Sequence, residues 1–499
     1  MEFSASPIWF IALPMLAAFS SPLWVRWRVL DQLLLGIPLG LLLLALGLFA
    51  TVQQAPLIET IVIAPPLGIH LHLDSAALLL VALFCFAVTL VAAFLWHGAT
   101  ETHLRGRQPF VLILLLLAGG NGLVLTGDLF NLYVFLEIAG ISAYVLTAVR
   151  DDRPALAAGL KYLIIGSVAG VFFLLAVVLI YLQTGQLNMA AVAQAFAEIP
   201  PAMQGLIAVL ALIGLGIKSE LFPFNFWVPD VYRGSDPAIT ALFSGLLVKA
   251  FLFVLVHLAV LIWIDPEIAR IWLMTLGALT LMVAELAALR QDEMRRMLAY
   301  SSLGQIGLIL LAFGFLHEST AAGAFFHLIS HTLAKLLLFL VAALLLRRVL
   351  SLHLDALTGA GRVYPLTVGL FVVGALCILG LPPLSGFMSK LWILQGFAAA
   401  QTFWPIALIL VAALIEAGYY FRWIRVLYAP AAASAVTDSK TSKTAPESWA
   451  TYAPLLLLVG LMLLLGIAPF VIEGALVDAA RALLDRDLLI QSVLGVAAQ

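Results

Sequence analysis

Charged residues are scarce in this sequence. Asp, Glu, Lys and Arg make up 10% of the 499 residues, whereas hydrophobic residues make up 64%. In soluble domains about a quarter of the residues are charged. This scarcity excludes a soluble protein and predicts an all-α polytopic membrane protein, since long apolar runs cross a bilayer as helices whose backbone groups are satisfied internally.

Cysteines and basic clusters are also lacking. The two cysteines, Cys85 and Cys377, lie in apolar runs, which excludes a disulfide framework and a CxxC metal site. A net charge of -2 without a basic cluster argues against nucleic-acid binding. No Gly-rich phosphate loop, nucleophile elbow or Cys/His ligand set is found. We therefore expect no cofactor, no metal and no enzyme chemistry in this chain, while quinone binding stays open.

Fourteen apolar segments are long enough to cross about 30 Å of hydrocarbon. The first begins with an acidic residue and without Lys or Arg, unlike a signal peptide, so we take it as a membrane helix. The predicted spans are 7–24, 30–52, 74–96, 109–127, 128–149, 159–183, 203–228, 237–263, 265–290, 299–315, 320–347, 365–397, 401–428 and 452–473.

The distribution of Lys and Arg between alternate loops predicts the orientation. The loops after odd-numbered spans hold Arg26, Arg28, Arg105, Arg107, Arg150, Arg153, Arg233, Arg290, Arg295, Arg296, Arg347, Arg348, Arg362, Arg422, Arg425, Lys440 and Lys443. The opposite side has Arg270, Arg481 and Arg486. Because cytoplasmic loops carry the excess of positive charge, both termini are predicted on the external side of a cell (inner) membrane.

Two spans are interrupted by proline. The seventh contains "LFPFNF" and the twelfth "LGLPPLSGFMSK", and proline breaks a helix because it lacks the N–H donor and clashes with the preceding turn. Paired broken helices in corresponding places of two halves are typical of inverted-repeat transporters. The predicted organisation is helices 1–3 (1–108), a first inverted repeat of helices 4–8 (109–263), a second of helices 9–13 (264–428), a polar cytoplasmic linker (429–451), and helix 14 with an external tail (452–499).

Charged residues recur inside the predicted spans. A charge near the middle of a bilayer costs about 2.5–3.5 kcal/mol on insertion scales, so it usually faces the protein interior and marks a pathway. These positions are Glu137, Lys218, Lys249, Lys335 and Lys390. The segment "FFHLISHTLAK" also places His327, His331 and Lys335 on one helix face. Burial lowers the pKa of a lysine and a nearby carboxylate raises it, so such a row suits proton transfer, with histidines as intermediates.

Other polar residues allow more than one interpretation. Lys161 is close enough to a span end to reach water. Glu220 could pair with the nearby Lys218, and the roles of Glu285 and Glu416 stay open. The segment "GIHLHLD" before the third span alternates like a short surface strand, with a metal role for its two histidines as the alternative.

Several stretches together resemble the antiporter-like subunits shared by respiratory complex I, membrane-bound hydrogenases and multisubunit Mrp-type cation/proton antiporters. They are "GDLFNLYVFLEIAGISAYVL" (127–146), "GIKSELFPFNFWVPDVYRGSDPAITALFSGLLVKAFLF" (216–253), "DEMRRMLAYSSLGQIGLIL" (292–310), "HLISHTLAKLLLFL" (327–340) and "LGLPPLSGFMSKLWIL" (379–394). The resemblance implies a central pair of Glu137 and Lys218, followed by Lys249 and Lys390. Asn225 departs from the family, in which a histidine is common.

The resemblance implies a function in a complex with other membrane subunits. A lysine at 390, the chain length, fourteen spans and no long lateral helix look most like the D subunit of a multisubunit Na⁺/H⁺ antiporter. On this hypothesis the chain moves protons, and Na⁺ passes elsewhere. The alternative is a proton-pumping subunit of complex I or a membrane-bound hydrogenase. A third hypothesis is a transporter that works alone, or a structural scaffold.

Overall fold

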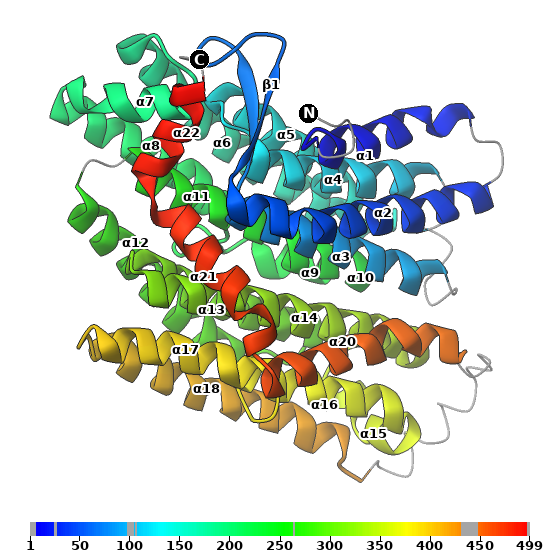
Figure 1. The fold of residues 1–499 in the computed structure, drawn as a ribbon. Helices are drawn as coiled ribbons and strands as arrows, with labels where there is room; N and C mark the ends of the chain where they lie inside the picture. The colour runs from blue at the N-terminus through cyan, green and yellow to red at the C-terminus, as the bar shows by residue number, and fades with distance from the viewer. Residues whose placement is uncertain are drawn as a thin grey trace.

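Long helices lie side by side along a common axis (Figure 1). The computed structural model describes residues 6–23, 27–96, 104, 107–262, 265–430 and 448–496. The N-terminal part and the first half contain α1 (Trp9–Ser20), η2 (Ser21–Leu23), α2 (Trp27–Gln54), α3 (Ser75–Trp96), α4 (Arg107–Leu125), α5 (Leu129–Thr147), α6 (Arg153–Thr184), α7 (Met189–Ala195), η4 (Phe196–Glu198), α8 (Pro201–Lys218), α9 (Val228–Gly234), α10 (Pro237–Leu242), the π-helical turn η5 (Phe243–Leu247) and α11 (Val248–Ile262).

The remaining helices form the second half and the C-terminal part. They are α12 (Pro266–Ala288), α13 (Met294–Gly314), α14 (Glu318–Val349), η6 (Asp355–Leu357), α15 (Ala360–Val363), α16 (Pro365–Leu379), α17 (Ser385–Ala399), α18 (Trp404–Leu427), α20 (Trp449–Ile467), α21 (Phe470–Leu484) and α22 (Arg486–Val496). Strands are confined, within the described ranges, to one antiparallel hairpin of β1 (Leu57–Ile61) and β2 (Ile69–Leu73).

The all-α polytopic class is confirmed. Among the described residues, 12 helices are long and apolar enough to cross a membrane, or 13 if the bent pair 355–363 and 365–379 counts as one span. Each of the fourteen predicted segments contains a helix. The two outside the 12 are α1, which is short, and the segment 365–397, which is divided into α16 and α17.

The two halves repeat a backbone pattern. In each half, two backbone hydrogen bonds join the start of one long helix to the loop that follows the next long helix. The helices are α5 and α6 in the first half and α13 and α14 in the second. Every residue in the second set of bonds lies 165 positions after its counterpart in the first. The bonds run from Leu129 N–H to Leu187 C=O, from Met189 N–H to Gly127 C=O, from Met294 N–H to Leu352 C=O and from Leu354 N–H to Asp292 C=O. This recurrence supports the predicted division into two repeats.

The proline breaks also recur. After α8, Leu221 N–H donates to Gly216 C=O (2.9 Å), and after α16, Leu381 N–H donates to Leu376 C=O (3.1 Å). The residue before each of these donors has a left-handed backbone: Glu220 with φ 62° and Gly380 with φ 76°. Both spans are therefore interrupted where the prolines predict it, and their C-terminal carbonyl ends lie inside the bundle.

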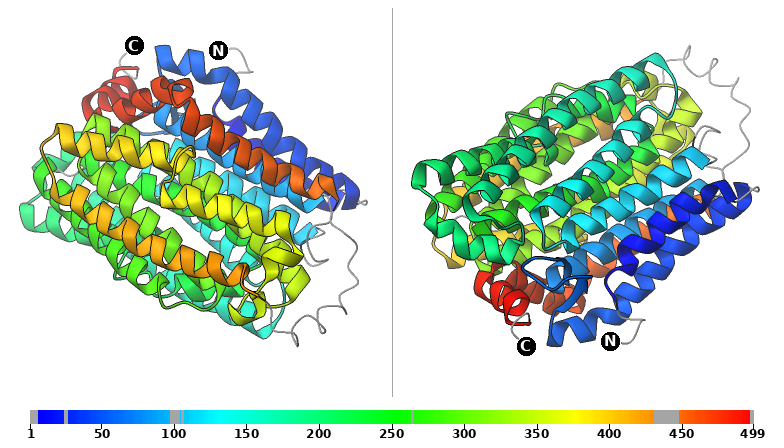
Figure 2. Two further views of the ribbon diagram at one scale, coloured as in Figure 1. Left: turned by 90° about the horizontal axis from the view of Figure 1, so that it is seen from below. Right: turned by 90° about the horizontal axis from the view of Figure 1, so that it is seen from above.

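The predicted C-terminal tail contains two helices, α21 and α22. In Figure 1 they run across the ends of other helices: α21 packs on α14 and α3, and α22 packs on α7. Arg486 donates to the carbonyl oxygens of Leu261 (2.9 Å) and Ala193 (2.5 Å), at the ends of α11 and α7. Within the described residues, Ile8 N–H donates to Glu59 Oε2 on β1 (3.0 Å), and α22 lies beside β2 (Figure 2). The tail thus connects the two halves at one end of the bundle.

Burial separates two kinds of helix. In the apolar stretches of α13 and α14, 94% of residues are buried, and α10–α11 reaches 89%. The corresponding share is 39% for α6 and 33% for α18. The first group forms the centre of the bundle, and it carries Lys249, Lys335 and both predicted relay histidines.

Candidate proton-relay site

The predicted central pair is brought together. Glu137 lies on α5 and Lys218 is the last residue of α8, and Lys218 Nζ is 3.8 Å from Glu137 Oε1. Lys218 also donates to the Tyr144 hydroxyl (2.7 Å). The lysine side chain is 1% exposed and that of the glutamate 23%. At the end of a helix, the ammonium is stabilised by the partial negative charge of the last carbonyls.

Glycines on α6 make room for these polar groups. A Cβ atom at Gly170 would lie 2.3 Å from Glu137 Oε1, and one at Gly166 would lie 2.0 Å from the Tyr144 hydroxyl oxygen. Real side chains do not approach so closely, so any other residue would displace the pair. The sequence therefore combines a charged pair on two helices with small residues on a third.

Lys249 lies on the first turn of α11 and is fully buried. Its ammonium donates to the Ser244 carbonyl oxygen in the π-helical turn η5. A π-helical turn frees carbonyl groups from their usual helical partners and is frequent at functional sites. The Ser244 hydroxyl lies 3.1 Å from the Ser302 hydroxyl on α13, which links the two halves.

His327, His331 and Lys335 share one face of α14, as predicted. The two imidazole rings are nearly parallel, with centroids 6.5 Å apart. Lys335 donates to the Ser301 hydroxyl (2.9 Å) and the Leu298 carbonyl oxygen (3.1 Å). Among the described residues, neither ring nitrogen of His331 has a hydrogen-bond partner. A buried polar group of this kind is a natural position for a water molecule or a transferred proton.

The hydrogen bonds of His327 define the tautomer of its neutral ring, and they can rearrange when the ring is protonated. Gln305 donates its amide to Glu416 (2.8 Å), so its oxygen accepts from His327 Nε2 (2.9 Å). His327 Nδ1 then accepts from the Ser389 hydroxyl (2.9 Å). Ser389 can instead donate to the Gly386 carbonyl oxygen (3.1 Å), which allows a proton on Nδ1 of His327. His327 can therefore be neutral or protonated while its neighbours Gln305 and Ser389 both keep hydrogen-bond partners.

Lys390 forms a second ion pair, and its partner was not predicted. Its ammonium is 2.8 Å from Glu416 Oε2 on α18 and donates to the Ile378 carbonyl oxygen (2.7 Å) at the end of α16. Glu285, on α12, is also buried and its Oε1 is 3.5 Å from Gln305 Nε2. The sequence showed that Glu416 and Glu285 are acidic residues within apolar spans. It could not show which residues they pair with, because pairing depends on which helices become neighbours.

Lys161 and Glu220 each have a partner that the sequence did not predict. Lys161 does not simply extend to water: it pairs with Asp230 (2.5 Å), a carboxylate that Arg296 also contacts. Glu220 hydrogen-bonds with Tyr232 instead of Lys218. Lys161 and Asp230 are 41% and 34% exposed, so they stand outside the buried row.

The hairpin histidines form a strand, but not a surface one. His70 is 1% exposed and His72 is 8% exposed, since α7, α11, α22 and residues 124–127 at the end of α4 lie around them. His70 Nδ1 is 3.1 Å from Asn188 Nδ2. Burial, together with the neighbouring His72, lowers the pKa of His70 to about 4. Among the described residues there is no group of three His, Cys, Asp or Glu side chains able to hold a metal ion.

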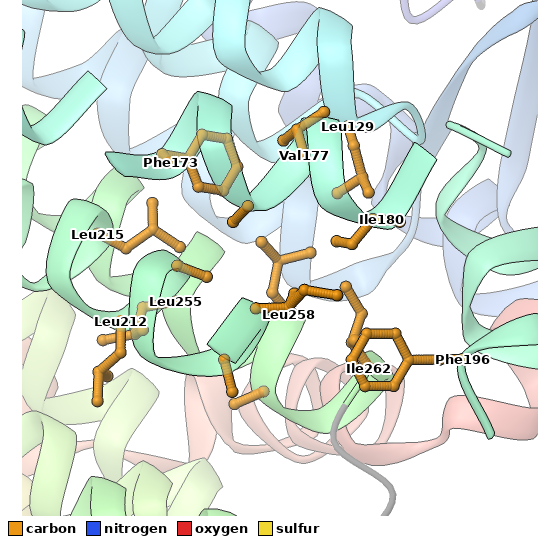
Figure 3. Close-up of a pocket in the computed structure, with 15 residues that line it drawn as sticks. Leu129, Phe173, Val177, Ile180, Phe196, Leu212, Leu215, Leu255, Leu258 and Ile262 are labelled. Carbon is orange, nitrogen blue, oxygen red and sulfur yellow. The ribbon is translucent and has the colours of Figure 1, made fainter. Parts of the chain in front are cut away.

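An apolar cavity lies between α6, α8 and α11 (Figure 3). Its walls include Phe173, Leu215, Leu255 and Leu258, and all its lining side chains are apolar. It offers no polar group to a proton or a cation, so it is separate in chemistry from the row of charges.

Comparison with known proteins gives one family. Residues 126–416 match the model described as "NADH:quinone oxidoreductase/Mrp antiporter, TM". The chain is 34% identical to the N subunit of the NADH-quinone oxidoreductase of Desulforudis audaxviator, covering 85% of this chain and 86% of that protein. It is 30% identical to the D subunit of the Na⁺/H⁺ antiporter of Alkalihalophilus pseudofirmus, covering 97% and 98%.

A solved structure agrees with this family. A chain of the membrane-bound sulfane sulfur reductase, an archaeal respiratory membrane complex, is 33% identical with a TM-score of 0.88, covering 98% of this chain and 100% of that one. The resemblance inferred from the sequence is confirmed. This chain, with its broken helices and buried row of lysines, belongs to the NADH:quinone oxidoreductase/Mrp antiporter transmembrane family.

Proposed function

We propose that this chain is a proton-translocating subunit of a multisubunit Na⁺/H⁺ antiporter. The observation that carries the proposal is the buried row of charges across both halves, with a glutamate–lysine pair at each end: Glu137 with Lys218, and Glu416 with Lys390. Similarity to the D subunit of a Na⁺/H⁺ antiporter over nearly the whole of both chains supports it.

The geometry suggests how a proton moves. In a buried site, a lysine beside a carboxylate holds its proton, and it releases the proton when the pair separates. The Glu137–Lys218 pair is at 3.8 Å, while Tyr144 holds the same ammonium at 2.7 Å. Lys218 therefore keeps a hydrogen-bond partner when Glu137 moves away. From Lys249 the row continues through His331 and His327 towards Lys390.

Proposed roles follow from position in this row. Glu137 and Lys218 form the first station, Lys249 the central one and Lys390 the last, and the connecting relay consists of His327, His331 and Lys335. We further propose that other membrane subunits surround the chain in a cell membrane, with both termini external, as the Lys and Arg distribution predicts. The 23% exposure of Glu137 supports a neighbouring subunit, since a carboxylate facing lipid is costly.

The test uses the assembled complex in inverted membrane vesicles. We expect Glu137→Ala and Lys218→Ala each to abolish cation-driven proton movement without preventing assembly. Glu267→Gln is the matched control, because it removes an exposed ion pair with Arg270 outside the row and should leave transport unchanged. Normal transport by either relay variant would contradict the central pair. Na⁺, K⁺ and Li⁺ are compared in the same vesicles.

A second candidate is a proton-pumping subunit of a redox-driven complex. The identity to the N subunit of an NADH-quinone oxidoreductase and to the sulfane sulfur reductase chain supports it. Purifying the complex through a tag on this chain separates the two. Iron–sulfur signals with proton uptake driven by electron transfer would establish the second candidate, and antiport without redox centres the first. Ion movement by the chain alone in liposomes would contradict both.

A further inference from the structure

Gln305 contacts ionisable side chains from three other helices. It lies on α13, in the centre of the bundle, and is 1% exposed. Its amide nitrogen is 2.8 Å from Glu416 Oε1 on α18 and 3.5 Å from Glu285 Oε1 on α12. Its oxygen is 2.9 Å from His327 Nε2 on α14. The contact with Glu285 is longer than a usual N–H···O hydrogen bond, so Glu416 and His327 define the orientation of the amide.

The orientation of this amide depends on the protonation of both neighbours. A carboxylate only accepts hydrogen bonds, so the Gln305 NH2 group faces Glu416 and the Gln305 oxygen faces a hydrogen on Nε2 of His327. If Nε2 loses its hydrogen, it needs a donor, and the amide has to make a half turn about its last bond, where the torsion is broad and roughly two-fold. The oxygen then faces Glu416 Oε1, so two acceptors meet unless that carboxyl group is protonated.

Lys390 directs an added proton to the oxygen of Glu416 that faces Gln305. Each oxygen of this carboxylate has its own donor: Oε1 accepts from Gln305, and Oε2 accepts from the Lys390 ammonium at 2.8 Å. While the ammonium is charged, a hydrogen on Oε2 would point at the hydrogens of Lys390. The added hydrogen therefore lies on Oε1. All groups then keep their partners when the amide has turned and donates to Nε2 of His327.

We propose that Gln305 is a positioning residue that couples the protonation of His327 to that of Glu416. In one arrangement Nε2 of His327 carries a hydrogen and Glu416 is a carboxylate. In the other, Nε2 has no hydrogen and Glu416 is a carboxylic acid. A protonated His327 and the Glu416 carboxylate thus become a neutral ring and a neutral acid, so charge and protons balance. The inference rests on the proposed function and deepens it.

This coupling lets the histidine relay act on Lys390. A buried lysine beside a carboxylate holds its proton, and it releases the proton more readily once the carboxylate is neutral. The Lys390 ammonium releases its proton, and the Glu416 acid then protonates the resulting amine, which restores the ion pair. A second proton follows only after the amide has turned back. Gln305 positions the reacting groups and carries no proton itself.

Two substitutions of Gln305 test whether this side chain has to donate and accept. Gln305→Met keeps the length of the side chain and removes the amide donor and oxygen. We expect it to lower proton transport at least tenfold in vesicles that contain the assembled complex. Gln305→Glu keeps a donor and an acceptor while the introduced carboxyl group is protonated, and only accepts once that group is ionised. Relative to the parent at the same pH, its transport should be retained at acidic pH and fall at least tenfold as the pH rises.

Gln395→Met is the matched control. Gln395 is an exposed glutamine on α17 outside the row of charges, and its replacement should leave transport unchanged at every pH. If Gln305→Met does not assemble, the pH profile of Gln305→Glu decides. Suppose Gln305→Met transports normally, or the transport of Gln305→Glu relative to the parent does not depend on pH. If Glu137→Ala is then inactive, the inference fails and the proposed function stands. If Glu137→Ala is also fully active, the proposed function fails with it.

Discussion

The two glutamate–lysine pairs differ in tightness. Glu137 and Lys218 are 3.8 Å apart with a partly exposed carboxylate, whereas Glu416 and Lys390 are 2.8 Å apart and the glutamate side chain is 1% exposed. Position 302, the counterpart of Glu137 by the 165-residue spacing, is a serine, and in the second half the carboxylate comes from α18 instead. A loose pair separates easily, and a tight buried pair holds its charge. On the proposed function, we therefore expect the first pair to open and close during transport and the second pair to stay closed.

Breaking the tight pair should have the largest effect on stability. Glu416→Gln leaves Lys390 as an uncompensated buried charge, which costs about 3–5 kcal/mol. We expect a corresponding loss of unfolding free energy in chemical denaturation of the solubilised complex. The double variant Glu416→Gln/Lys390→Met should recover most of the loss. If the single variant is as stable as the parent, the pair is not charged in the folded protein.

The β1–β2 hairpin should make the stability of the protein fall at low pH. The His70 pKa falls from 6.5 to about 4 on burial, so folding disfavours its protonation. The contribution of neutral His70 to the free energy of unfolding is complete above pH 6.5. It is lost as the pH falls towards 4, and the loss is at most about 3 kcal/mol. We expect the melting temperature to fall over this range, and His70→Asn to reduce the dependence. If the melting temperature depends on pH equally in His70→Asn and in the exposed-site control His353→Asn, the assignment to His70 is wrong.

The two relay histidines should differ in their structural contribution. His327→Leu removes two buried hydrogen bonds, one to the Gln305 side-chain oxygen and one to the Ser389 hydroxyl, which costs about 1–3 kcal/mol. His331→Leu removes no hydrogen bond and should change stability by less than about 1 kcal/mol. Both should lower proton transport. A larger stability loss in His331→Leu would show that His331 has a partner, such as a bound water molecule.

The loose pair should make the smallest contribution to stability. Glu137→Gln removes a partner at 3.8 Å, while Lys218 keeps its hydrogen bond to Tyr144. We expect a smaller loss than for Glu416→Gln, because the pair is longer, its carboxylate is partly exposed and Tyr144 still holds the ammonium. Transport should nevertheless stop. Thermal melting of the assembled complex and the vesicle assay measure the two effects separately, and a loss as large as that of Glu416→Gln would remove the contrast between the halves.

The sequence predicts the elements better than their partners. The fourteen segments and both proline breaks follow from apolar length and backbone chemistry, and the histidine face follows from helical periodicity. The sequence assigned no role to Glu416 or Gln305. Their contacts depend on the packing of α18 against α17 and of α13 against α14. The burial of His70 was not predicted for the same reason, since the residues around it come from α4, α7, α11 and α22, all more than fifty residues away in the sequence. The role of each relay residue stays a prediction.

The return of the C-terminal tail affects which motions the protein can make. Because α21 packs on α14 and Arg486 donates to carbonyl groups at the ends of α7 and α11, residues 470–496 connect the two halves at the hairpin end. Rocking one half against the other would have to break these contacts. The proposed function therefore does not need one half to rotate against the other: on that proposal the helices stay in place, and side chains and hydroxyl groups pass the proton along the row.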